Sequence, residues 1–450
     1  MANSSQWPVV RSQNTVDLKE HILNSYSVHP AKAVKGEISV PGDKSISHRS
    51  IILGSIARGI TTVSGFLRGE DNIATLNAFR SMGTEIEDDG VTLKIHGKGL
   101  HELSEADDVI DCGNSGTSIR LLTGLLSGQS FFSVLTGDKY LRKRPMKRVV
   151  TPLAAMGAKI AGRAGGEKAP LGITGGALHG ISYDSPVASA QVKSAILLAG
   201  LYAAGETTVR EPHLSRDHSE RMLKHFGADI DSRGTEVTIR GGRELRAQEI
   251  IVPGDISSSA FFMVAGLITP GSELLIKGVG VNPTRTGIID ILTLMGGKIT
   301  LLNQRDVSGE PIADILVQSS ALHGIEISGD LVPRAIDEFP VISVAAAMAA
   351  GKTVIRDARE LRVKETDRIK AMADNLRLAG VKVEEADDGM TVYGAEKFTA
   401  FHADSCGDHR IAMSMLIAGL VASGPCTVDD TECISTSFPN FFTLLEQVSR

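Results

Sequence analysis

SVPGDKSISHRS, residues 39–50, and IVPGDISSSA, residues 251–260, contain the same Pro-Gly-Asp turn at two distant places in the chain. Proline and glycine favour a tight turn, and the Asp or Ser that follows can accept hydrogen bonds from the free N–H groups of a helix start. Each turn leads into apolar sequence with interspersed serines, which is typical of the first turns of a helix. This repetition predicts two related halves.

The bulk composition is that of a two-domain globular protein. A chain of 450 residues is too long for one ordinary core, and 42% of its residues are hydrophobic. The net charge of −6 provides no overall basic excess, so we expect no nucleic-acid partner. The uncharged run 411–424 is too short to cross a bilayer, so we expect no membrane association.

The cysteines and the N-terminus bear on the cellular compartment. Cys112, Cys406, Cys426 and Cys433 show neither a CxxC pair nor a metal-ligand spacing, so we expect free thiols and no metal site. Residues 1–28 lack the apolar segment of a signal peptide, and we expect them to form a mobile extension. These features predict a cytoplasmic protein.

Two interleaved patterns repeat along the chain about every seventy residues. In the first, an apolar run ends in a small residue and a glycine, and a β-type run follows; its glycines are Gly59, Gly128, Gly205, Gly271, Gly351 and Gly424. In the second, a helix closes on a glycine that leads directly into a strand; its glycines are Gly83, Gly157, Gly227, Gly296 and Gly380. Each unit therefore reads as a βαβαββ-like module, and six such modules predict an α/β fold of two similar domains with three modules each.

The two Pro-Gly-Asp turns mark the places where the chain would cross between these domains. Residues 42–253 would form domain 2, and residues 29–41 would join residues 254–450 in a discontinuous domain 1. This division follows from the symmetry of the repeats.

The apolar helices begin with small, capping or charged residues. Their starts read GDKSISHRS, GNSGTSIR, VASAQVKS, GDISSS, IDEFP and GDHRIAMS. A helix N-terminus offers unpaired N–H groups and a partial positive charge, so converging starts would attract anions, above all phosphate. Ordinary N-caps are the alternative, and we favour it for GDISSS. It is weaker at GDKSISHRS, where Lys44 and Arg49 add two cations beside Ser45.

Three other segments concentrate charge. KYLRKRPMKR, residues 139–148, carries six basic residues, for which a solvated loop is an equally good interpretation. In ELRVKETDRIK, Lys364, Glu365 and Arg368 fall within one helical turn, although a surface helix with salt bridges is favoured from composition alone. Asp337 precedes apolar sequence, a setting that can shift the pKa of an acid or a base.

These motifs, in this order, resemble those of the 5-enolpyruvylshikimate-3-phosphate (EPSP) synthases. The resemblance covers residues 30–445 and rests on PGDKSISHR, GNSGT, KRPM, SAQVKS, RDHSE, NPTR, IDEFP, LRVKETDR and DHRIAMS. Three of the spellings, SAQVK, RDHSE and NPTR, are similar to the second class of the family, whose members are often insensitive to glyphosate. The resemblance implies two domains that close as a hinged clamp, and transfer of the enolpyruvyl group of phosphoenolpyruvate to the 5-hydroxyl of shikimate 3-phosphate without any cofactor.

The resemblance also implies roles for individual residues. Shikimate 3-phosphate would be bound by Lys44, Ser45, Arg49, Ser189, Ala190, Gln191, Arg216, Asp337 and Lys364. Phosphoenolpyruvate would be bound by Lys44, Gly116, Arg144, Gln191, Glu365, Arg368 and Arg410. Asp337 would be the base for the hydroxyl and Glu365 the proton shuttle at C3, while Lys44 could share either role.

Two positions bear on inhibitor and donor binding. Thr436 stands where first-class members have a lysine, so one phosphoenolpyruvate contact is missing or supplied elsewhere. At Gly116 some tolerant second-class relatives carry alanine, so glycine predicts that glyphosate competes with phosphoenolpyruvate here.

Three alternatives compete with this hypothesis. A UDP-N-acetylglucosamine enolpyruvyl transferase would place a cysteine on the loop around residues 139–148, which contains none. A non-catalytic two-lobed anion-binding protein would need the arginines but not Asp337 and Glu365. An RNA-end-processing enzyme is disfavoured by the net acidity. We expect a monomer.

Overall fold

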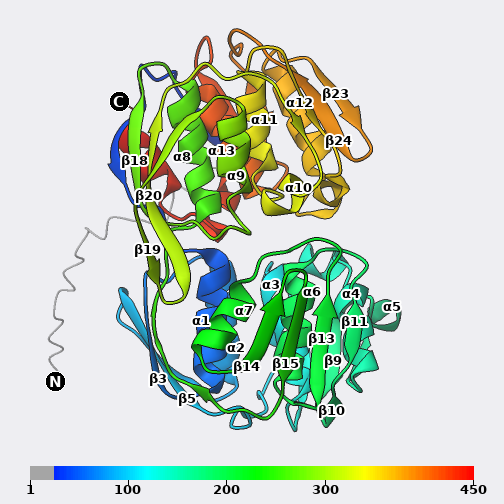
Figure 1. Ribbon diagram of the computed structural model, residues 1–450. Coiled ribbons are helices and arrows are strands. Elements are labelled where there is room, and N and C mark those ends of the chain that lie inside the picture. Colours follow the sequence, from blue (N-terminus) through cyan, green and yellow to red (C-terminus); the bar gives the residue numbers. More distant parts are fainter. Residues whose placement is uncertain (1–24, 450) are drawn as a thin grey trace, which may run out of the picture.

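The computed structural model describes residues 25–449, which fold into two domains of similar plan (Figure 1). There are two separate hydrophobic cores. One is built from residues between Ile46 and Val252, and we call this part domain 2. The other is built from residues between Val28 and Val40 and between Ile256 and Val448, and we call it domain 1. The described chain thus passes from domain 1 into domain 2 and then back into domain 1.

Domain 2 contains three main sheets around buried helices. Its helices are α1 (Lys44–Ile56), α2 (Glu70–Ser81), α3 (Gly116–Ser127), α4 (Lys147–Ala155), α5 (Arg163–Gly166), α6 (Ala190–Gly200) and α7 (His218–His225). Its strands are β3 (Ala57–Ser64), β4 (Glu85–Asp88), β5 (Thr92–Lys98), β6 (Ile110–Asp111), β7 (Phe132–Thr136), β8 (Lys159–Gly162), β9 (Lys168–Thr174), β10 (Leu178–His179), β11 (Ser182–Asp184), β12 (Ala203–Ala204), β13 (Glu206–Arg210), β14 (Asp229–Arg233), β15 (Glu236–Arg240), β16 (Leu245–Arg246) and β17 (Glu249–Ile251). The sheet orders are β16-β3-β5-β4 with β17 also on β3, β6-β7-β9-β8 and β11-β13-β15-β14.

Domain 1 repeats this plan. Its helices are α8 (Ile256–Ile268), α9 (Gly287–Leu294), α10 (Leu331–Arg334), α11 (Phe339–Ala347), α12 (Arg368–Leu378), α13 (His409–Gly419) and α14 (Phe441–Val448). Its strands are β1 (Ser25–Val28), β2 (Lys35–Ile38), β18 (Glu273–Gly280), β19 (Lys298–Val307), β20 (Glu310–Gln318), β21 (Glu326–Ile327), β22 (Lys352–Ile355), β23 (Val383–Ala386), β24 (Gly389–Tyr393), β25 (His402–Asp404) and β26 (Cys426–Asp429). The sheet orders are β2-β18-β20-β19, β21-β22-β24-β23 and β1-β26-β25.

The predicted repeat is confirmed. Each unit runs from a buried helix through a strand to an outer helix and then to two further strands, as in α3, β7, α4, β8 and β9. The glycines that end five outer helices all have φ between 82° and 99°, a conformation that other residues rarely adopt. They are Gly83, Gly157, Gly227, Gly296 and Gly380. The last unit ends with its outer helix, α14.

The buried helices of each domain pack directly on one another. Helices α3 and α6 are in contact in domain 2, as are α8, α11 and α13 in domain 1. Gly124 lies where α3 meets α6, and a Cβ there would lie 2.1 Å from the carbonyl oxygen of Ala195. A larger residue at this position would force the two helices apart. Among the described residues, no helix is both long and apolar enough to span a membrane.

The two Pro-Gly-Asp turns lie side by side where the chain crosses between the domains. Strand β2 pairs with β18 of domain 1 but leads into α1 of domain 2, whereas β17 pairs with β3 of domain 2 but leads into α8 of domain 1. The Asp43 N–H donates to the carbonyl of Pro253 at 2.7 Å, and the Asp255 N–H donates to that of Pro41 at 2.9 Å. As expected, the Asp43 and Asp255 carboxylates cap the N-termini of α1 and α8.

Two local expectations differ from the structure. Residues 25–28, expected in a mobile extension, form β1 and pair antiparallel with β26; the rest of that extension, residues 1–24, lies outside the described residues. Lys364 and Glu365 do not lie on a helix with Arg368. Helix α12 begins only at Arg368, because Asp367 caps it by accepting from the Lys370 N–H at 3.0 Å.

Candidate functional site

The starts of several buried helices, together with the start of α12, bring charged side chains from both domains together. The ion pairs that cross between the domains at this place include Arg216 with Asp337, and Arg144 with Glu365 at 3.6 Å. Because each helix N-terminus adds partial positive charge, the surroundings favour anions. The basic segment 139–148, for which a solvated loop was an equal alternative, contributes Arg144 to this cluster.

Asp337 lies at the centre of the cluster, just before α11. Its carboxylate pairs with Arg216 of domain 2 and, within domain 1, lies 3.5 Å from Lys364 Nζ and 3.4 Å from Arg368 Nη1. Arg410 Nη1 donates to the Asp337 backbone carbonyl at 3.0 Å. The Asp337 carboxylate therefore forms ion pairs with side chains from both domains.

The cations keep Asp337 ionised. Burial by itself would raise the pKa of this carboxyl group, but Arg216, Lys364, Arg410 and Arg368 outweigh burial and hold the pKa well below its usual value of 3.8. Asp337 is therefore ionised throughout the neutral pH range.

Glu365 and Arg368 form a second charged centre. Arg368 Nη2 lies 2.7 Å from Glu365 Oε2, and its Nε lies 2.8 Å from the fully buried carboxylate of Asp408. Burial would raise the pKa of Glu365, but Arg368 and then Arg144 lower it below its usual value of 4.5. Arg144 also donates to Asn114 Oδ1 at 2.6 Å, which orients its guanidinium group.

Lys44 and Gln191, which belong to domain 2, lie in the first turns of α1 and α6. Lys44 forms an ion pair with Asp71, at the start of α2, and its backbone N–H donates to Asp255 at 3.2 Å. Gln191 Nε2 donates to Thr117 Oγ1 at 3.0 Å, and Arg120 donates to Gln191 Oε1 at 2.6 Å.

Sequence reasoning missed Asp71, Asn114 and Arg120. Arg120 lies one helical turn after Gly116, and this spacing within GNSGTSIR could have revealed it. Burial, and then the nearby Arg144, lower the pKa of Arg120 to about 10. Asp71 carries no sequence signal, because its partner Lys44 belongs to a different helix.

Several of the residues expected to bind shikimate 3-phosphate lie at the starts of α1 and α6. Ser189 caps α6, and Ala190 is the first residue of that helix. The donors of Arg49, like those of Arg368, are occupied within the protein. Those of Arg49 contact Ser219 Oγ at 2.7 Å, Ser194 Oγ at 2.8 Å and the Ser45 carbonyl, one turn earlier in α1, at 3.0 Å.

Comparison with known proteins identifies the family. A family model described as EPSP synthase (3-phosphoshikimate 1-carboxyvinyltransferase) matches residues 28–445. The chain belongs to the EPSP synthase family. A 3-phosphoshikimate 1-carboxyvinyltransferase from Geobacter metallireducens is 73% identical over 95% of this chain and 100% of that protein. One from Geotalea daltonii is 74% identical with the same coverage.

Solved structures agree with this EPSP synthase assignment. The EPSP synthase of Acinetobacter baumannii is similar with a TM-score of 0.86 and 51% identity, over 94% of this chain and 98% of that one. The enolpyruvyl transferase NikO from Streptomyces tendae, at 18% identity and a TM-score of 0.75, shares the fold. These matches do not favour the UDP-N-acetylglucosamine alternative.

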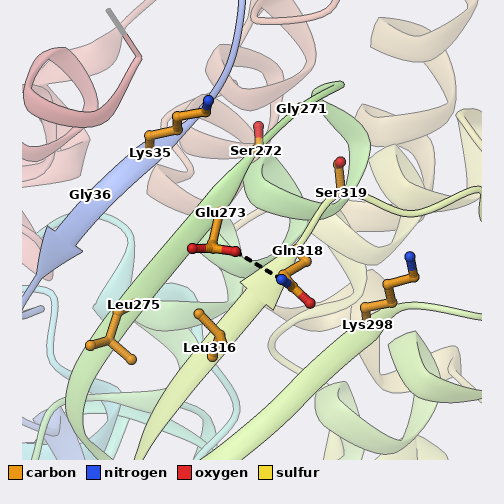
Figure 2. A pocket seen from close by; sticks show the side chains of 10 residues that line it. All are labelled: Lys35, Gly36, Gly271, Ser272, Glu273, Leu275, Lys298, Leu316, Gln318 and Ser319. Atoms are coloured by element: carbon orange, nitrogen blue, oxygen red, sulfur yellow. Dashed lines mark hydrogen bonds between the residues drawn. The ribbon is translucent and has the colours of Figure 1, made fainter.

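One surface cavity of this EPSP synthase family member lies away from the charged cluster. It has a volume of about 620 Å³ and lies on the sheet formed by β2, β18, β20 and β19. In this cavity Gln318 Nε2 donates to Glu273 Oε2 at 2.8 Å. Figure 2 shows this hydrogen bond, with Lys35 and Lys298 on either side of it. None of the predicted site residues lines it, so it plays no part in the candidate site.

Proposed function

We propose that this chain transfers the enolpyruvyl group of phosphoenolpyruvate to the 5-hydroxyl of shikimate 3-phosphate and releases phosphate, the reaction of the EPSP synthase family. The supporting observation is that Asp337 and Glu365, both ionised, lie among five cations from the two domains: Arg144, Arg216, Lys364, Arg368 and Arg410. Two neighbouring polyanions require such a concentration of cations to offset their repulsion.

The two substrates would use different parts of the cluster. For shikimate 3-phosphate we propose Lys44, Ser45, Arg49, Ser189, Ala190, Gln191, Arg216, Asp337 and Lys364. For phosphoenolpyruvate we propose Lys44, Gly116, Arg144, Gln191, Glu365, Arg368 and Arg410. Arg120 lies beside Gly116 and Arg144, so it adds a cation near the proposed donor site. Thr436, which stands where first-class members have a lysine, lies beside Gly69. Thr436 itself donates its hydroxyl to the carbonyl of Cys433 at 2.7 Å.

The chemistry requires two proton transfers. Asp337 accepts the proton of the 5-hydroxyl of shikimate 3-phosphate. At the same time the oxygen of that hydroxyl bonds to C2 of phosphoenolpyruvate, and C3 gains a proton. The tetrahedral adduct then loses a C3 proton and expels phosphate. Because bound polyanions draw the arginines away from Glu365, its pKa would rise on substrate binding, and Glu365 could then donate to C3 and recover the proton. Lys44 can share either transfer.

Phosphate release on mixing both substrates tests this function. We expect release only when shikimate 3-phosphate and phosphoenolpyruvate are both present. Shikimate 3-phosphate should also raise the thermal unfolding temperature, because it binds only the folded state, whereas UDP-N-acetylglucosamine should not. Binding of both substrates without phosphate release would instead indicate a non-catalytic anion-binding protein.

Glyphosate should compete with phosphoenolpyruvate, because Gly116 leaves room beside two arginines. A Cβ at this position would lie 2.8 Å from Arg120 Nη1 and 2.9 Å from Arg144 Nη1. Gly116→Ala should therefore displace both guanidinium groups. We expect this variant to raise the glyphosate inhibition constant by about 10- to 100-fold, and more than it raises the phosphoenolpyruvate KM, because the inhibitor is the more extended molecule. Steady-state inhibition kinetics measure both constants, and equal changes in the two would contradict this account.

We also propose that the protein is a cytoplasmic monomer. Its four cysteines are free thiols, which suits a reducing compartment. Each hydrophobic core is completed within the one chain. Light scattering at several protein concentrations should give the mass of one chain, 47.7 kDa, at each of them.

A further inference from the structure

The NPTR motif, residues 282–285, has no role in the chemistry above. Its last residue, Arg285, has a side chain that is only 3% exposed, yet it carries a full charge. Burial by itself would lower the pKa of Arg285, but Asp43, Asp255 and then Glu338 raise it above its usual value. The side chain is therefore a permanently charged group inside the protein.

Arg285 lies between the two Pro-Gly-Asp turns. Its Nη1 lies 3.4 Å from Asp43 Oδ2, and its Nη2 lies 3.4 Å from Asp255 Oδ1. These carboxylates cap α1 and α8, which belong to different domains. One guanidinium group thus offsets the repulsion between two buried carboxylates at the place where the chain crosses twice.

The same side chain reaches the segment that carries Asp337. Arg285 Nη2 donates to Ser257 Oγ at 2.7 Å and lies 3.9 Å from Glu338 Oε1. Ser257 in turn donates to Glu338, the neighbour of Asp337. Lys44, which follows Asp43, and Asp337, which precedes Glu338, are therefore both one residue away from a partner of Arg285.

The first residue of the motif contacts the opposite domain. Asn282 Nδ2 donates to Asp217 Oδ1 at 2.7 Å and to Glu310 Oε2 at 2.9 Å. Asp217 follows Arg216, which pairs with Asp337. The NPTR loop of domain 1 therefore contacts domain 2 next to both Lys44 and Arg216.

We propose that Arg285 is a positioning residue that sets the angle between the two domains, so that Lys44 and Arg216 of domain 2 meet Asp337 of domain 1. The proposed function is the basis for this role. Arg285 touches no substrate; it acts through Asp43, Asp255 and Glu338. A misplacement of about 1 Å at reacting groups can lower a rate about 100-fold, so this contact has a large effect on turnover.

Four variants test the proposal in the full chain: Arg285→Met, Arg285→Lys, Asp43→Asn, and Arg285→Met combined with Asp43→Asn. The double variant removes the cation together with one of the two carboxylates that repel each other, while the Asp43→Asn change keeps an oxygen that can cap the Ile46 N–H. Arg285→Lys and the double variant carry the test if Arg285→Met does not fold, because both reduce the uncompensated buried charge. Arg334→Met is the matched control, since Arg334 bonds the carbonyl of Pro283 in the same loop and lies outside the crossings.

We expect Arg285→Met to lower kcat by about 100-fold with a smaller change in either KM, and we expect the lysine and the double variant each to recover about tenfold. Small-angle scattering of the unliganded protein should show an altered domain arrangement in Arg285→Met that returns toward wild type in the double variant. Arg334→Met should keep kcat within about threefold. Asp43→Asn should lower kcat by less than Arg285→Met does, because the guanidinium group keeps its contacts with Asp255 and Ser257.

Two results would overturn the proposal. One is a folded Arg285→Met with wild-type kcat and scattering. The other is a loss that neither lysine nor Asp43→Asn recovers, which would indicate simple packing. If the wild-type chain releases no phosphate, the proposed function fails, while the scattering of the same variants still decides whether Arg285 sets the angle between the domains.

Discussion

Asp337→Asn is expected to lower kcat by about 1,000-fold while leaving the KM for both substrates within about tenfold. The amide keeps the shape of the carboxylate but cannot accept the proton of the 5-hydroxyl. Substrate binding should persist, because Arg216, Lys364 and Arg368 are freed to contact the anions instead. Steady-state phosphate release gives kcat and both KM values.

Asp290→Asn is the control for this prediction. Asp290, on α9, pairs with Arg334 at 2.6 Å and lies outside the charged cluster. Its replacement should leave kcat nearly unchanged. If Asp337→Asn turned over at a near-normal rate, or raised both KM values with kcat intact, Asp337 would be a partner of the cations rather than the base.

Arg368→Met is expected to lower the free energy of unfolding by about 3–5 kcal/mol and to abolish measurable turnover. The Arg368 side chain is 2% exposed and contacts three carboxylates: Asp408, Glu365 and Asp337. Without the guanidinium group, the fully buried Asp408 carboxylate loses the cation that lies 2.8 Å from it. Urea denaturation followed by circular dichroism measures the change.

Arg377→Met, on the same helix, separates this effect from a general loss of helix stability. Arg377 is 41% exposed and pairs with Asp374 and Glu385 at the surface. We expect a cost below about 1 kcal/mol for this variant, because water screens exposed ion pairs. If both variants lost the same free energy of unfolding, the buried ion pairs of Arg368 would stabilise the fold no more than exposed ones do.

The repeated architecture was predictable because its signals are local. A glycine that ends a helix, or an Asp that caps the start of one, acts on residues only a few positions away. The end of a helix at Gly83 and the start of one at Asp43 could therefore be read from the sequence. The chain crosses to the other domain directly after β2 and again directly after β17, which is consistent with the symmetry of the two turns. The start of α12 differs from the expectation because the Asp367 side chain caps the helix, so that Lys364 and Glu365 lie before it.

The site itself was predictable in part. The motifs led to Asp337, Glu365 and most of the cations. Asp71 lies in none of the quoted motifs, and the roles of Asn114, in GNSGT, and Arg285, in NPTR, could not be inferred from those motifs. The surroundings of Arg49 also went unseen, because its partners Ser194 and Ser219 come from other segments.

The six units, the helix starts and the kinds of charge available to the site follow from the order of the amino acids. Which charges face each other emerges only in three dimensions, as in the pairing of Arg216 with Asp337 and the place of Arg285 between Asp43 and Asp255. The physical reason is that backbone propensities act between neighbours in the chain, whereas pKa shifts and buried ion pairs depend on distances between segments that folding alone brings together.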